Sequence, residues 1–244
     1  AEKAFPCCAS FSGVRGLAYN TGRAQYFAGN GSAVGIFNSG LTFLREETLG
    51  GVSGIQGMTF DGNLLYVVHT GSGKVSKSFL ATTVTTRPTG IAFTPSTSAP
   101  GAALWVLVEG DPLDKLLKVD PSTGALITTF GTGGAVDVPS DRSAGVTFLN
   151  TGNPATSFLW VLSNEGEAFG GKSIKVYKVN PSTGAIAGTL NLSQTAMVFD
   201  DAGDITNNGT DLVLYFETFN DMVTIDPADG SQVQRTFLGT TAMF

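Results

Sequence analysis

A short motif recurs along the chain and limits what the chain can fold into. Its clearest copy, GMTFDGNLLYVVHTG at residues 57–71, has a short apolar run, a tight Asp-Gly-Asn turn and a second apolar run. Related stretches begin at Gly16, Gly90 and Gly145, and a fainter one begins at Gly203. Apolar runs of this length on both sides of a turn are typical of β-hairpins. Because the hairpin returns every 33–58 residues, the chain is predicted to repeat one β-unit.

A second motif follows the first in the C-terminal half of the chain. The sequence reads DPSTG at residues 120–124, NPSTG at 180–184 and DPADG at 226–230. Asp or Asn before Pro starts a turn, because Pro fixes φ and the Asx side chain bonds the backbone two residues on. The closing glycine can take a positive φ. With apolar residues on both sides, each copy is predicted to join two strands of a second hairpin.

Two hairpins per repeat give four antiparallel strands, named A to D from the centre outward. Such units repeated around an axis are the pattern of a β-propeller, so the predicted fold class is an all-β propeller of four-stranded antiparallel blades. Five blades are visible, and the sequence leaves open whether they close a ring of five or are five of six. Residues 1–15 are predicted to be an N-terminal segment and residues 16–244 the propeller domain.

The motif glycines have a predicted role in this fold. They begin strand A, which lines the central channel, where a glycine lets neighbouring backbones approach closely. Strand B of each blade carries one large aromatic side chain, which is expected to pack between blades: Tyr26, Tyr66, Trp105, Trp160 and Tyr215.

Composition narrows the class of partner. The formal net charge of −6 disfavours nucleic acids and anionic membranes, which attract basic surfaces. No apolar run reaches the roughly 18 residues of a transmembrane helix. Charged residues make up only 14% of the chain and Gly is abundant, a composition that favours a secreted or cell-surface protein.

The two cysteines, Cys7 and Cys8, are adjacent. Neighbouring Cα atoms lie about 3.8 Å apart, which is shorter than the roughly 4.4–6.8 Å of a normal disulfide. Unpaired or separately paired thiols, a strained vicinal disulfide and a metal or redox role all stay open.

The stretch at residues 57–75 resembles the NHL repeat, in which Gly-Ile-Ala, Asp-Gly-Asn, Leu-Tyr-Val and a basic-Val pair succeed one another. The DPSTG segments resemble blades of the wider superfamily that includes streptogramin-lyase-like and surface-layer-associated propellers. This resemblance implies a propeller that binds more often than it catalyses. A gluconolactonase-like propeller would hold a divalent metal at the channel mouth, and Glu109, Asn164 and Asp204 are the nearest candidates for its ligands.

Covalent catalysis has little support in the residues. His69 is the only histidine, and a surface position is expected for it at the end of strand B. With its only histidine expected at the surface, the chain does not favour a catalytic triad, and one histidine is thin support for a histidine-dependent metal site. An enzyme is therefore less favoured than a binding protein.

The acids have an uneven predicted distribution. Most fall in the B–C and D–A connections, which emerge on one face of a propeller, and this would make that face electronegative. Calcium prefers several carboxylate and carbonyl oxygens, so seven acids are candidate ligands: Asp200, Asp201, Asp204, Glu109, Asp111, Glu165 and Glu167. Ordinary solvated loop acids are the competing interpretation.

The sequence therefore predicts a non-catalytic extracellular or cell-surface propeller that acts as a binding or structural module. Its partner would be a protein or a small-molecule ligand on the acidic face, and it could belong to a larger assembly. The alternative is a metal-dependent hydrolase or lyase with an acidic site at the channel mouth.

Overall fold

The computed structural model describes residues 14–60, 65–69, 74–77, 80–83, 88–97, 101–110, 112–166, 172–192, 202–216 and 221–237. These ranges contain no helix. Their β-strands form five four-stranded antiparallel sheets, which are the blades.

Blade 1 consists of β1 (Gly16–Asn20), β2 (Gln25–Asn30), β3 (Ala33–Asn38) and β4 (Phe43–Thr48). Blade 2 consists of β5 (Ile55–Phe60), β6 (Leu65–His69), β7 (Lys74–Lys77) and β8 (Leu80–Thr83). Blade 3 consists of β9 (Pro88–Thr94), β10 (Ala103–Val108), β11 (Lys115–Val119) and β12 (Ala135–Asp137). Blade 4 consists of β13 (Ser143–Leu149), β14 (Phe158–Gly166), β15 (Lys172–Val179) and β16 (Ile186–Asn191). Blade 5 consists of β17 (Ala202–Asn207), β18 (Leu212–Phe216), β19 (Asp221–Ile225) and β20 (Gln232–Phe237).

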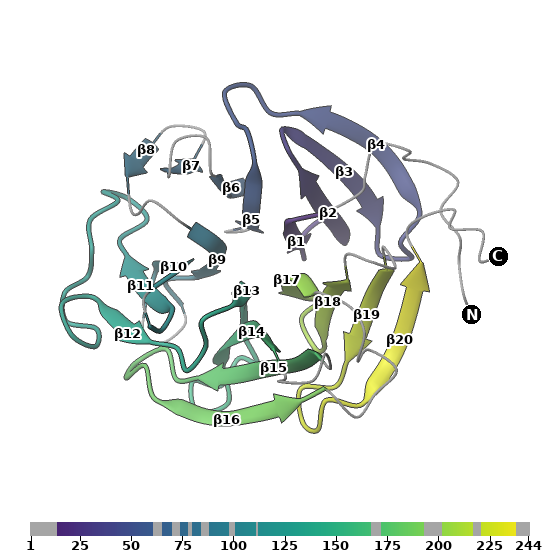
Figure 1. Cartoon of the computed structure of the whole chain (residues 1–244). Coiled ribbons are helices and arrows are strands. Elements are labelled where there is room, and N and C mark those ends of the chain that lie inside the picture. The colour runs from purple at the N-terminus through teal and green to yellow at the C-terminus, as the bar shows by residue number, and fades with distance from the viewer. Residues whose placement is uncertain are drawn as a thin grey trace.

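The sheets surround a central channel, and the first strand of each blade lies innermost (Figure 1). The inner strands contact one another in the order β1, β5, β9, β13 and β17, and β17 contacts β1 again. Two long-range hydrogen bonds join the first and last of these blades. The backbone N–H of Leu17 donates to Asp204 Oδ2 over 2.5 Å, and the N–H of Val14 donates to the Tyr215 hydroxyl over 3.4 Å. The predicted propeller is confirmed, and within the described residues the ring closes with five blades.

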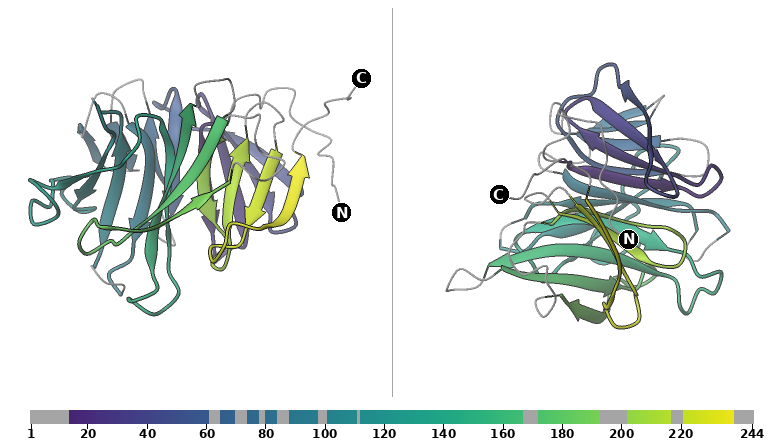
Figure 2. Two further views of the ribbon diagram at one scale, coloured as in Figure 1. Left: turned by 60° about the horizontal axis from the view of Figure 1, so that its bottom comes forward. Right: turned by 90° about the vertical axis from the view of Figure 1, so that its right-hand side faces the viewer.

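The strands of each blade cross the thickness of the ring (Figure 2). All strand pairs within the blades are antiparallel, so the A–B and C–D turns emerge on one face and the B–C and D–A connections on the other. Each face of the propeller therefore carries its own two types of connection.

The three Asx-Pro turns have the predicted geometry. In each, the closing glycine N–H donates over 2.8 Å to the carbonyl of the first residue: Gly124 to Asp120, Gly184 to Asn180 and Gly230 to Asp226. The three glycines have φ between 75° and 78°. The Asx oxygen also accepts the N–H two residues on, at 2.7 Å in Asp120 and 2.8 Å in Asn180. These contacts are the reason that the motif recurs almost unchanged.

The outer strand of blade 3 differs from the sequence expectation. Residues 125–130 match the start of β16 in sequence, but only Leu126 forms an isolated bridge, to Val119. The N–H of Phe130 then donates to the carbonyl of Ile127, which turns the chain, and the strand resumes as β12 after the glycines at 131, 133 and 134. Phe130 is buried against the Trp105 ring, with centroids 4.9 Å apart. Packing of this side chain thus accompanies the interruption of the strand.

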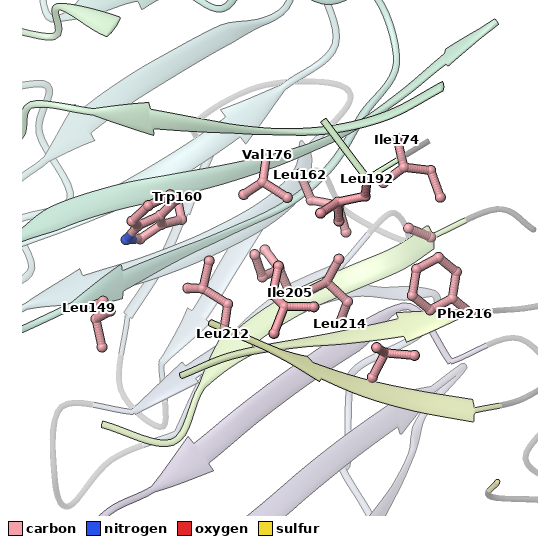
Figure 3. Close-up of a cluster of buried hydrophobic side chains, with 13 residues drawn as sticks. Leu149, Trp160, Leu162, Ile174, Val176, Leu192, Ile205, Leu212, Leu214 and Phe216 are labelled. Carbon is pink, nitrogen blue, oxygen red and sulfur yellow. The ribbon is translucent and has the colours of Figure 1, made fainter. Parts of the chain in front are cut away.

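The hydrophobic core is divided into five clusters, one between each pair of neighbouring blades. Figure 3 shows the cluster between blades 4 and 5, where Trp160, Leu162 and Val176 face Ile205, Leu212 and Leu214. All five predicted strand B aromatics are buried, with exposed fractions of 6% or less. Their predicted role in packing between blades is confirmed.

No helix in the described part of the chain has the length and apolar character to cross a membrane. Cys7 and Cys8 lie outside the described residues, so the three interpretations of this pair stay open.

Candidate binding sites in the central channel

Glycines bring the inner strands together at the narrowest part of the channel. A Cβ atom on Gly57 would lie 2.8 Å from the Cα of Gly90, and one on Gly90 would lie 2.8 Å from the Cα of Gly145. Non-bonded carbons do not approach this closely, so any side chain at these positions would push the inner strands apart. The hub of the channel, defined here by Gly16, Gly57, Gly90, Gly145 and Asp204, therefore needs glycine in four blades.

Asp204 occupies the fifth hub position. A bulge separates it from Ala202, just as bulges precede Gly57 and Gly145 in their blades. The alignment of the repeats on Gly203 was therefore wrong by one residue, because it ignored this bulge. The sequence does indicate the correct alignment, because DITN at 204–207 matches GVTF at 145–148.

The Asp204 side chain fills the space that the glycines leave. Its Oδ1 lies 2.0 Å from where a Gly145 Cβ would be, and it accepts the N–H of Ile205 over 2.8 Å. Oδ2 accepts the N–H of Leu17. Asp204 is 2% exposed, and its carboxyl group joins blade 5 to blade 1.

Burial dominates the ionisation of this carboxyl. It raises the pKa of Asp204 well above its usual range, and the N–H groups of Ile205 and Leu17 oppose that shift. Loss of hydration disfavours the charged form more than two neutral donors favour it. The group is thus built as an acceptor for backbone donors inside the fold.

One end of the channel, the charged mouth, is a cavity of about 250 Å³ on the side of the B–C and D–A connections. Its floor consists of the five residues that directly precede the hub positions: Arg15, Gln56, Thr89, Ala144 and Gly203. Its wall adds Glu109, Asp141, Arg142, Ser143, Asn164 and Ala202. Two arginines, two carboxylates and two amides therefore share one opening.

Hydrogen bonds hold the wall of the charged mouth in place. Asp114 is fully buried and accepts the N–H of Ser143 over 2.6 Å and that of Gly110 over 3.1 Å. The Asn164 side chain bonds both the N–H and the carbonyl of Ala202, at 3.0 and 2.8 Å. This side chain, a candidate metal ligand in the sequence, is committed to linking blade 4 to blade 5.

The opposite end, the aromatic mouth, is a cavity of about 320 Å³ on the side of the A–B turns. All five blades contribute to it, mainly through residues two and three positions after the hub: Tyr19, Thr59, Phe60, Phe93, Thr147, Phe148, Thr206 and Asn207. Thr21, Pro95, Asn150 and Gly209 complete the lining. None of these twelve side chains is an acid or a basic residue, which distinguishes this mouth from the charged one.

The structure separates the described members of the predicted metal set. Asp204 lies in the hub, and Glu109 lines the charged mouth. Glu165 instead forms an ion pair with Lys175 and accepts a hydrogen bond from the Tyr177 hydroxyl. Asp111, Glu167, Asp200 and Asp201 lie outside the described residues. Within the ranges that the structure describes, no three His, Cys, Asp or Glu residues gather as a metal site needs.

Basic residues balance several other acids of this face. Asp137 pairs with Lys115 at 2.5 Å, and Asp221 pairs with Arg235. With two arginines in the mouth itself, the described part of the face carries both signs of charge. The prediction of an electronegative face counted the acids in the B–C and D–A connections and left out these basic residues.

His69 departs from its expected surface position. It ends β6 opposite Ile55, and it is 3% exposed. The residue pairs with the inner strand of its own blade, which places it among buried neighbours.

No protein-family model matches the sequence, and no curated protein does so either. Solved structures do match the fold. A chain of a nidogen–laminin complex gives a TM-score of 0.61 at 12% identity, covering 93% of this chain and 80% of that one. Myxococcus xanthus glutaminyl cyclase gives a TM-score of 0.58 at 15% identity, covering 84% and 86%. A β-propeller domain of Cps50 (Swd1) from Myceliophteria thermophila gives 0.53 at 11% identity, covering 91% and 71%. At these identities the similarity extends to the fold, and the chain is a β-propeller.

Proposed function

We propose that this β-propeller is a non-catalytic binding module that works outside the cell or at its surface, and that it receives part of a protein partner in the charged mouth. The observation that carries the proposal is the lining of this mouth, where Arg15 and Arg142 stand with Glu109 and Asp141 around a cavity of about 250 Å³. A surface of mixed charge can recognise a partner by complementary potential, which favours specificity and fast association.

The rigidity of the wall supports the same proposal. Buried Asp114 fixes the backbone at Ser143, and Asn164 fixes blade 4 against blade 5. A preorganised surface loses less conformational entropy when a partner binds. The nidogen–laminin complex, in which a chain of similar fold occurs, is consistent with a protein partner. The extracellular location rests on composition alone.

A site-specific crosslinking experiment tests the proposal. A photoreactive phenylalanine analogue replaces Gln56 on the floor of the mouth, and the same analogue replaces exposed Thr189 on the outermost strand of blade 4 as a control. We expect a discrete adduct with an extracellular protein from position 56 only, and its loss when Arg142→Glu is added. Equal labelling from both positions, or labelling that ignores Arg142→Glu, would contradict a partner in the charged mouth.

We retain the alternative, a metal-dependent hydrolase or lyase, as an outcome of a separate measurement. Metal content after exhaustive dialysis distinguishes the two functions. One divalent ion per chain that stays bound through dialysis against a chelator would favour the enzyme, whereas no ion, or calcium that the chelator removes, would favour the binding module.

We also propose calcium binding on the same face, on the sequence alone. Glu109 shares the charged mouth with two arginines, which repel a cation. Such a site would therefore depend on Asp111, Glu167, Asp200 and Asp201, and calcium would stabilise the face on which the partner binds.

A further inference from the structure

The lining of the aromatic mouth repeats from blade to blade, whereas the lining of the charged mouth does not. Three residues after the hub position, four blades carry an aromatic ring and the fifth carries an amide: Tyr19, Phe60, Phe93, Phe148 and Asn207. All five line the same cavity of about 320 Å³. Aromatic residues from four of the five blades therefore contribute to the lining, and Tyr19, Phe60 and Phe93 are the partly exposed ones.

Neighbouring rings fix the orientation of these aromatics. Phe93 stacks on Tyr66 at 5.9 Å between centroids with a 10° interplanar angle, and Phe60 meets Phe27 edge-on at 4.6 Å. Tyr19, Phe60 and Phe93 are partly buried, so part of each remains exposed at the mouth. Rings held in this way offer flat apolar surfaces at little cost in side-chain entropy.

Neutral polar groups alternate with the rings. Exposed Thr21 and partly buried Thr59 contribute hydroxyls that can donate and accept hydrogen bonds, whereas Thr147 and Thr206 in the same lining are buried. Asn207 Nδ2 donates to Thr147 Oγ1 over 2.8 Å and to the carbonyl of Phe148 over 3.0 Å, which fixes this side of the wall. A purely apolar ligand would remove water from these hydroxyls without replacing its hydrogen bonds. A charged ligand would find no opposite charge among the lining residues.

The size of the cavity limits what it can take. A cavity of about 320 Å³ is at the small end of ligand sites, which range over roughly 300–1,000 Å³. A cavity of this size suits the end of a chain or a small molecule more than the middle of an extended peptide.

We propose that the aromatic mouth is a binding site for a neutral saccharide, as a free sugar or as the terminal unit of an uncharged glycan. A sugar ring has an apolar face of C–H groups that stacks on aromatic rings, and its hydroxyls match the donors and acceptors of the threonine side chains. The inference concerns the opposite end of the channel from the proposed protein site, so either can fail alone.

The test uses an array of neutral, sialylated and sulfated glycans, followed by titration calorimetry of the free terminal saccharide of the best neutral hit. We expect binding to neutral glycans only. Thr59→Val keeps the shape of the side chain and removes one hydroxyl, so affinity should fall about tenfold. Phe93→Leu keeps an apolar side chain and removes the flat ring, and it should abolish detectable binding. Gln56→Ala, in the charged mouth, is the matched control and should leave affinity unchanged.

Each contrary outcome overturns the proposal. No neutral glycan bound, or equal binding of sulfated glycans, would show that the mouth does not select neutral sugars. Tighter binding of a decaproline peptide than of any glycan would reassign the aromatic mouth to a peptide. Sugar binding that survives both Thr59→Val and Phe93→Leu would place the site elsewhere. Circular dichroism of both variants must match the wild type, and Thr59→Val, which changes no ring packing, gives the decisive titration if Phe93→Leu unfolds.

Discussion

The two ends of the channel use the same five strands and lie only a few residues apart on each, yet they differ in how regular they are. The position directly before the hub reads Arg15, Gln56, Thr89, Ala144 and Gly203 across the blades, with no common chemistry. The position three residues after the hub is aromatic in four blades out of five.

Packing explains the difference. The residues after the hub have one side against the core between blades, as Phe93 does against Tyr66. The residues before the hub lie at β-bulges in blades 2 to 5, outside the regular ladder, and of these residues Ala144 alone packs against a core cluster. A position that packs in every blade is restricted in every blade, whereas a bulged position at the mouth is free to vary. The positions directly before the hub are therefore less restricted by packing than the aromatic positions three residues after it.

The largest effect is expected in the hub, which lies between the two mouths on each inner strand. Gly90→Ala would place a Cβ 2.8 Å from the Cα of Gly145 and 2.9 Å from the nitrogen of Val146. Both are backbone atoms of the adjacent inner strand, so the strands must separate, and the free energy of unfolding should fall by about 3 kcal/mol or more. Urea denaturation measures this loss.

Gly188→Ala is the matched control, because its Cβ would meet nothing closer than 3.9 Å. Stability should stay the same or rise slightly. Equal stability of the two variants would mean that the inner strands are not in close contact.

Asp204 tests whether the hub needs a carboxyl in the fifth blade. Asp204→Gly would give all five blades the same hub residue, but it would remove the acceptors of the Leu17 and Ile205 N–H groups. Two buried donors without partners and the loss of side-chain packing should destabilise the fold by about 2–3 kcal/mol. A variant as stable as the wild type would show that the fifth glycine serves equally well.

The pH dependence of the same residue has a definite sign. Burial raises the pKa of Asp204 in the folded chain above its unfolded value, so the folded state keeps the proton to higher pH. The contribution of Asp204 to stability is thus complete below the unfolded pKa, near 3.9, and is lost as the pH rises through the folded pKa. Asp204→Asn does not titrate. Its deficit relative to wild type, measured by denaturation from pH 4 to pH 8, should shrink as the pH rises, and a deficit that grows would contradict the raised pKa.

Some features of the fold and of the two mouths could be predicted from the sequence, and others could not. The Asx-Pro turns and the strand B aromatics were predictable, because local hydrogen bonds and regular packing repeat with the sequence. The alignment on Gly203 missed the hub position of Asp204, because a bulge shifts the register by one residue and only the match of residues 204–207 to residues 145–148 indicates it. The pairing of Glu165 with Lys175 was not predictable, since the two residues lie on different strands. Closure with five blades became visible only through contacts between β1 and β17, which are far apart in the chain.

A pair of substitutions compares the two mouths directly. Phe93→Ala removes a partly buried ring that stacks on Tyr66 and should lower the free energy of unfolding by about 2 kcal/mol. Gln56→Ala, on the floor of the charged mouth, should change it by less than about 0.5 kcal/mol. Thermal and urea denaturation of both variants measure the contrast. Similar losses in the two would remove the distinction between a packed and an unpacked mouth.

The smallest effect is expected from calcium at the charged mouth. If the acids at 111, 167, 200 and 201 complete a site near Glu109, binding to the folded state alone stabilises it by RT ln(1 + [L]/Kd), or about 1.4 kcal/mol at ten times Kd. For a chain of this size that gain raises the melting temperature by roughly 3–5 °C. Melts in 10 mM calcium against a chelator measure it, and Asp200→Asn with Asp201→Asn should abolish it. Arg15→Gln removes one repulsive charge from the same mouth and should enlarge the shift, whereas it would change nothing if calcium bound elsewhere. Identical melting temperatures with calcium and with chelator would contradict calcium binding at the charged mouth. The difference between the two mouths would then consist of packing and of the residues that line them, without any ion.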